Sequence, residues 1–130
     1  MRYHWLQISI KNDIDLFNKI SDLLGVKPTK LERLGKFKDK NDLWIYAVDT
    51  DDNAAYYDFI NEFLNILEPN FSELAQLGIE RNDITFWLLY EYDQQCGLEF
   101  HPQEMKRLGE SGIVLCIDCW QTKDEKSTTA

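Results

Sequence analysis

The chain has 130 residues, a length that suits a single domain and allows a hydrophobic core to form without disulfides or a metal ion. Hydrophobic residues make up 44% of it, too many for a disordered chain, yet no apolar run is long enough to cross a membrane. Its 23 acidic and 14 basic residues give a formal net charge of −9, which should keep the protein soluble, repel nucleic acid and anionic lipid, and complement a basic partner.

Alternation of apolar and polar residues predicts a first strand over residues 3–10, and apolar residues at helical spacing predict a following helix that ends at Gly25. Asn12 is expected to cap this helix, with Asp15 at its third position. Residues 26–41 show no strong periodicity and are predicted to form a long loop, which is locally basic.

The rest of the chain alternates strands with helices. In chain order we predict a strand over 42–49, a helix with an apolar stripe from Tyr56 that ends at Pro69, a short helix over 72–77, a strand over 84–92, a short extended piece over 98–101, a helix from Pro102 to Gly109 and a strand over 113–120. The order is β-α-β-α-(α)-β-α-β, with no internal repeat and no linker between two domains.

This order, with one apolar stripe on each main helix, predicts the α+β class. We expect a single domain over residues 1–120, in which helices pack on one face of a largely antiparallel sheet of four or more strands, and a polar tail over residues 121–130. A doubly wound parallel sheet is disfavoured, because its strands would be near-continuous aliphatic runs.

The cysteines and the start of the chain indicate a cytoplasmic protein. The first residues lack the apolar segment of a signal peptide, and an odd number of cysteines, three, is typical of free thiols in a reducing compartment. Cys116 and Cys119 match C-x-x-C, but positions three apart on a strand point to opposite faces, which argues against a shared zinc ion or a disulfide. We expect no metal site and no cofactor.

No group of residues has the spacing of a catalytic site, and we expect no catalytic residues. His4 is interpreted as an exposed strand residue and His101 as the residue before a helix. Asp118 lies in an apolar strand, where a carboxylate needs a partner or water. An alternative hypothesis is therefore a small enzyme or small-ligand-binding domain with a pocket near Asp118, His101 and Arg33, the last from the basic loop.

Each of the four tryptophans falls on a different predicted strand. Alternation puts Trp5, Trp87 and Trp120 opposite the aliphatic side chains that helices would cover, and we place Trp44 with them although the pattern around it is mixed. Tryptophan is enriched at interaction surfaces because it combines a large apolar area with one polar group. The face is either a binding surface or is covered by the loop over residues 26–41.

Several short segments carry a resemblance to a known family. They are Leu24 to Thr29 after the first helix, Gly35 in the loop, Asp42 to Trp44 at the start of the second strand, and Ile117 to Trp120 in the last strand. Over residues 3–120 the chain resembles a family of bacterial domains of unknown function, number forty-two seventy-nine, with Trp120 where a tyrosine is more usual. The resemblance implies a bacterial origin and a compact α+β domain, and no established activity.

Together these observations predict a non-enzymatic binding protein that uses an acidic surface and the tryptophan-bearing face. Members of the resembled family are similar in size and charge to immunity proteins of bacterial toxin systems, so the function we expect is inhibition of the immunity type. The binding residues we expect are Trp5, Trp44, Trp87, Trp120, Asp118 and Arg33. The partner is another protein or, when none is present, a second copy in a homodimer through this face.

Overall fold

The computed structural model describes residues 1–11, 13–32 and 41–123. Arg33 and the expected helix cap Asn12 therefore lie outside the described residues, as do residues 124–130 of the expected tail. The elements are β1 (Arg2–Ile10), α1 (Ile14–Leu24), β2 (Lys30–Glu32), β3 (Asp42–Thr50), α2 (Phe59–Leu67), α3 (Phe71–Gln76), β4 (Ile84–Tyr92), α4 (Pro102–Ser111) and β5 (Val114–Gln121).

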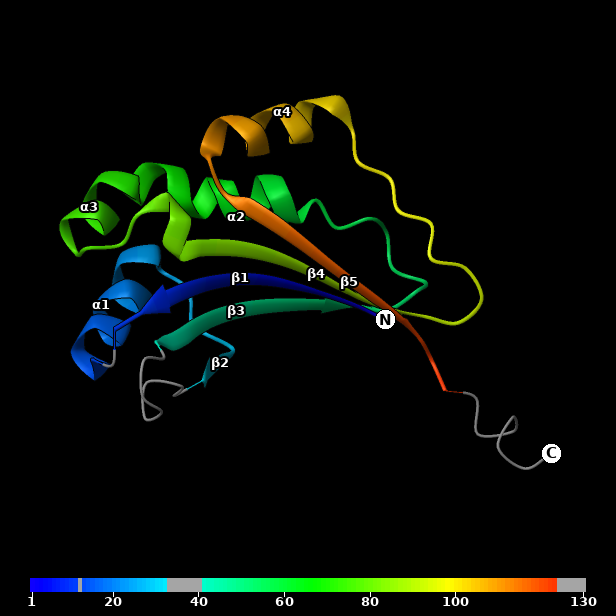
Figure 1. Ribbon diagram of the computed structural model, residues 1–130, viewed down its shortest axis with the longest axis horizontal. Helices are drawn as coiled ribbons and strands as arrows, with labels where there is room; N and C mark the ends of the chain where they lie inside the picture. Colours follow the sequence, from blue (N-terminus) through cyan, green and yellow to red (C-terminus); the bar gives the residue numbers. More distant parts are fainter. Residues whose placement is uncertain (12, 33–40, 124–130) are drawn as a thin grey trace.

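The strands form one five-stranded sheet in the order β2-β3-β1-β4-β5. All neighbours are antiparallel except β4 and β5, which are parallel because α4 carries the chain back across the sheet between them. Figure 1 shows the helices gathered on one side of the sheet. The predicted α+β class and element order are confirmed, and the sheet is mixed.

The core lies between the helices and one face of the sheet. Strand β1 alternates as predicted, with Leu6, Ile8 and Ile10 buried toward the helices. Helix α2 is the main element that covers them, since its apolar stripe is fully buried; the residues are Phe59, Ile60, Phe63, Leu64 and Leu67. Phe63 packs edge-on against Phe86 of β4, with ring centroids 5.4 Å apart. No helix among the described residues covers the other face of the sheet.

Several boundaries differ from the predictions for local reasons. Asp13 caps α1, because its Oδ1 accepts hydrogen bonds from the backbone N–H of Asp15 at 2.9 Å and of Leu16 at 3.3 Å. Helix α4 continues past Gly109 and ends at Gly112, whose φ of 74° is the left-handed conformation that glycine adopts readily.

Two further predictions were wrong in detail. The segment over 26–41, of which residues 33–40 lie outside the described residues, contains the short strand β2, which pairs with β3. The piece over 98–101 pairs with no described strand. Tyr56 precedes α2 instead of belonging to its stripe, and its hydroxyl donates a 2.7 Å hydrogen bond to Glu104 of α4. Within the described residues no helix is long and apolar enough to span a bilayer.

Candidate functional site

The side chains on the helix-free side of the sheet form a surface that we call the open face. Strand register places Trp5 of β1 directly opposite Trp87 of β4, and Trp87 opposite Cys116 of β5. Both tryptophans are half-buried, and they occupy the middle strands of the sheet. A pair of adjacent indoles therefore lies at the centre of a face that no described helix covers, as alternation predicted for these two residues.

Trp120 extends the open face to the edge of the sheet. Its ring stacks on that of Tyr3, with centroids 6.3 Å apart and planes 6° from parallel, and it is 39% exposed. Trp87 differs from it in one respect: within the described part of the chain, its indole Nε1 is buried and has no hydrogen-bond acceptor.

Trp44 does not belong to the open face, and the prediction that placed it there was wrong. Its register partner on β1 is Ile8, which points toward the helices, and Trp44 is fully buried in the core. The indole Nε1 donates a 3.0 Å hydrogen bond to the Ser21 hydroxyl of α1. Ile45, which points to the open side, is also fully buried, so both faces of β3 are apolar here and alternation gave no clear direction.

Carboxylates border the tryptophans and Tyr3. Asp49 of β3 pairs with Tyr3 of β1. On the other side of β1, Tyr3 pairs with Leu89 of β4, which in turn pairs with Asp118 of β5. Glu91 lies beside Trp120 on the neighbouring strand. Burial, followed by the carboxylates of Glu91 and Asp49, raises the pKa of the Tyr3 phenol. The open face thus has an apolar centre and an acidic margin.

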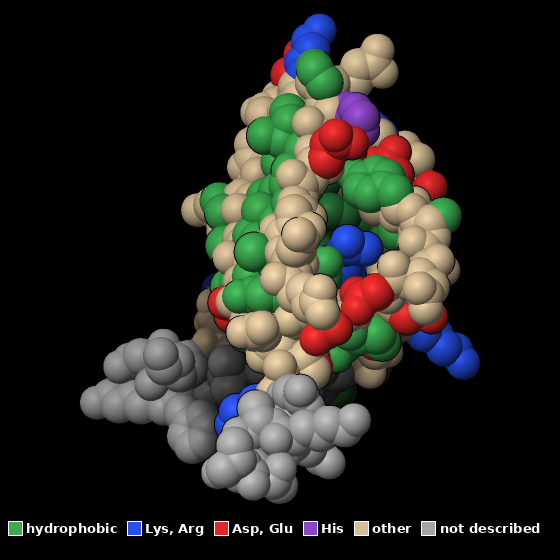
Figure 2. All heavy atoms as spheres, turned by 90° about the vertical axis from the view of Figure 1, so that its right-hand side faces the viewer, with side chains coloured by type: hydrophobic (Ala, Val, Ile, Leu, Met, Phe, Trp, Pro, Cys, Tyr) green, Lys and Arg blue, Asp and Glu red, His purple; other side chains and the backbone are tan. Residues whose placement is uncertain are grey.

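Strand β5 forms one edge of the sheet and is largely exposed. Among the described strands it pairs only with β4, and its exposed side chains include Val114 at 56%, Ile117 at 44% and Trp120 at 39%. Figure 2 shows hydrophobic side chains in a stripe down one side of the molecule. An apolar edge strand of this length is a ready site for contact with another chain.

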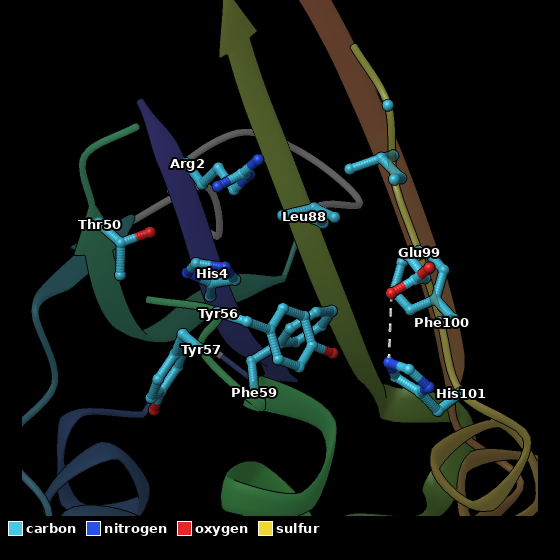
Figure 3. Close-up of a pocket in the computed structure, with 12 residues that line it drawn as sticks. Arg2, His4, Thr50, Tyr56, Tyr57, Phe59, Leu88, Glu99, Phe100 and His101 are labelled. Carbon is cyan, nitrogen blue, oxygen red and sulfur yellow. Dashed lines mark ion pairs between the residues drawn. The ribbon is translucent and has the colours of Figure 1, made fainter. Parts of the chain in front are cut away.

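A cavity of about 290 Å³ lies on the helix side of the sheet, next to the first residues of β1. Arg2 and His4 of β1, Thr50 of β3 and Leu88 of β4 form one wall. The opposite wall consists of two loop segments and the start of α2; its residues are Tyr56, Tyr57, Phe59 and Gly97 to His101. Figure 3 shows Arg2, His4 and Tyr56 on one side of this space and the segment with Glu99 to His101 on the other.

The structure does not bring the three residues of the alternative hypothesis together. His101 lines the cavity, where its Nε2 lies 3.4 Å from the Glu99 carboxylate. Asp118 is exposed on the open face, on the other side of the sheet. Arg33 lies outside the described residues. A pocket shared by His101 and Asp118 is therefore not formed.

Sequence reasoning missed two polar residues of the cavity, Arg2 and His4. His4 was expected to be exposed, yet it is 3% exposed. The signal was available, because His4 is two residues before Leu6 and must point to the same side of the strand. Arg2 is two residues before His4, so alternation places its side chain on the same side of the strand.

The cysteines are free thiols in the structure, and Cys116 and Cys119 point to opposite faces of β5 as expected. Among the described residues, no group of histidine, cysteine, aspartate and glutamate side chains could hold a metal ion.

Fold and surface together define a small α+β domain with helices on one face of a mixed sheet and an aromatic, acid-bordered second face that no described helix covers. Residues 1–122 match the family described as Domain of unknown function (DUF4279), so the chain belongs to that family. The resemblance seen in the sequence is thereby confirmed. No curated protein and no solved structure gives a significant match.

Proposed function

We propose that the protein is a non-enzymatic binding domain that holds a protein partner against the open face. The observation that carries the proposal is the pair Trp5 and Trp87, side by side on the central strands and uncovered by any described helix. Binding energy at protein interfaces is concentrated in central aromatic residues surrounded by a polar margin. Trp120 and Val114 of β5, which point to the same side of the sheet as Trp87, enlarge the same apolar area.

A partner with a basic surface fits this face best. Asp49, Glu91 and Asp118 border the aromatic centre, and the whole chain carries a formal net charge of −9. Opposite charge on the partner would steer the encounter and fix the register of the complex. An inhibitor of the immunity type, which covers a basic bacterial toxin in the cytoplasm, has these properties, and we propose that role.

A second copy of the chain is a less suitable occupant. In a dimer formed through the open face, the acidic margins of the two copies would lie against each other, and like charges across an interface are unfavourable. The homodimer remains the form to test when no partner is present, because the exposed apolar area of β5 favours association.

Site-specific photo-crosslinking tests the proposal in the cells that naturally make the protein. A benzophenone amino acid replaces Asp118 on the open face or, as the control, Gln76, which is exposed on α3 at the helix side. We expect position 118 to give one dominant adduct with a basic protein, and position 76 to give none.

Adducts of equal yield at both positions, or none at position 118, would overturn the proposal. An adduct of the chain with itself would identify the occupant as a second copy. The adducted protein should then be purified and mixed with the wild-type chain, since only direct binding of the two pure proteins establishes the complex.

A further inference from the structure

We infer that the cavity on the helix side binds a small aromatic carboxylic acid that carries a hydrogen-bond donor at the end opposite its acid group. The cavity is separated from the open face by the sheet, so the inference does not depend on the proposed function. It rests on two polar side chains of β1, Arg2 and His4, and on the aromatic walls around them.

His4 supplies a hydrogen-bond acceptor inside the cavity. The residue is 3% exposed, and its Nδ1 lies 2.9 Å from the backbone carbonyl oxygen of Val48. A carbonyl only accepts, so the proton of the neutral ring is assigned to Nδ1 and Nε2 keeps a lone pair. Burial, the largest influence, lowers the pKa of the imidazole and favours that neutral form.

The acceptor on His4 is directed at the cavity. In Figure 3 one ring nitrogen lies on the β3 side and the other faces the space in front of Tyr56 and Leu88. Within the described residues, Nε2 has no hydrogen-bond partner. An acceptor that faces the cavity and has no protein partner is available to a hydrogen-bond donor of a ligand.

Arg2 supplies a cation that no described carboxylate neutralises. Its guanidinium lies over the Tyr90 ring, 4.5 Å from the centroid, and Nη2 donates to the Tyr90 hydroxyl at 3.3 Å. It forms no ion pair with a described residue, although acidic residues outnumber basic ones in the chain. Guanidinium groups bind carboxylates through paired N–H donors, so a ligand acid group fits here.

Arg2 and His4 are close enough to contact one small ligand. Their backbones lie roughly 7 Å apart, because a strand rises about 3.4 Å per residue and residues two apart point to the same side. A single ring with an acid group at one end and a donor at the other is a ligand of suitable size for the cavity of about 290 Å³. Thr50, the register partner of Arg2, adds a hydroxyl at the acid end.

The walls of the cavity suit an aromatic ring and are held in place. Tyr56, Phe59 and Phe100 line it with aromatic surface, and such mostly apolar pockets with few polar groups are typical ligand sites. Glu104 of α4 joins the two loop segments of the cavity wall. Its carboxylate accepts hydrogen bonds from the Tyr56 hydroxyl at 2.7 Å and from the His101 backbone N–H at 2.6 Å.

Isothermal titration calorimetry of the intact protein with three related compounds tests the inference. Para-hydroxybenzoate has both groups, benzoate lacks the donor and methyl para-hydroxybenzoate lacks the charge. We expect saturable binding of one para-hydroxybenzoate per chain, and binding at least about tenfold weaker for each of the other two. The difference in affinity between para-hydroxybenzoate and benzoate measures the contact with His4 without a substitution that could alter the fold.

Arg2→Met should weaken para-hydroxybenzoate binding by about tenfold or more, whereas Arg81→Met should leave it unchanged. Arg81 is a matched control because its guanidinium also lies over an aromatic ring, that of Phe71 at 3.8 Å, but it does not line the cavity. Three results would overturn the inference: no saturable binding up to about 10 mM, unchanged binding by Arg2→Met, or binding of benzoate as tight as that of para-hydroxybenzoate.

Discussion

Trp44→Ala is expected to lower the free energy of unfolding by about 3–5 kcal/mol, as removal of a fully buried tryptophan does. The side chain is 0% exposed, packs in the core between β3 and α1, and donates a 3.0 Å hydrogen bond to Ser21. Its removal leaves a large cavity, and the Ser21 hydroxyl loses its donor. Urea denaturation followed by circular dichroism measures the loss without relying on the tryptophans themselves.

The matched control is Trp120→Ala. This tryptophan is 39% exposed and stacks on one side chain, Tyr3, so its removal should cost less than about 1 kcal/mol. Equal losses for the two variants would contradict the assignment of Trp44 to the core and of Trp120 to a surface. A small loss for Trp44→Ala alone would do the same.

Phe63→Ala should destabilise the protein by a similar amount, about 3–5 kcal/mol. Phe63 is fully buried at the centre of α2, and its ring meets those of Phe86 at 5.4 Å, Phe59 at 6.0 Å and Tyr46 at 6.1 Å. The contacts with Phe86 of β4 and Tyr46 of β3 attach α2 to the sheet. Differential scanning calorimetry should show the transition at a markedly lower temperature with an unchanged two-state shape.

Phe71→Ala provides the comparison for that variant. Phe71 is half-buried at the start of α3, beneath the Arg81 guanidinium, and its truncation should cost clearly less than that of Phe63. A Phe63→Ala protein as stable as Phe71→Ala would show that α2 is not the main attachment of the helix layer to the sheet.

The sequence predicted the elements that have one apolar side. β4 was placed at its observed bounds, 84–92, and the burial of Leu6, Ile8 and Ile10 followed from alternation. Trp44 was misplaced because β3 buries residues on both faces, and period-two reasoning needs one polar face to give a direction. β2 has only three residues and so no period to detect.

The cavity could not be predicted, because it depends on contacts between distant segments. Tyr56 and Glu104 are 48 residues apart in the chain, and their hydrogen bond joins the segment before α2 to α4. Tyr56 fitted the helical spacing of the residues after it, so periodicity assigned it to the helix. The parallel pairing of β4 with β5 was also invisible, since strand patterning carries little information on direction when one strand is an exposed edge.

The affinity of the crosslinked partner for open-face variants tests the central claim most directly. With the partner purified, Trp5→Ala and Trp87→Ala should each weaken binding by about 2 kcal/mol or more, which is a rise of about 30-fold in Kd. Met105→Ala is the control, because Met105 is a 46% exposed apolar residue of α4 on the helix side. Unchanged binding by both tryptophan variants, or an equal loss in Met105→Ala, would contradict the claim that the open face is the binding surface.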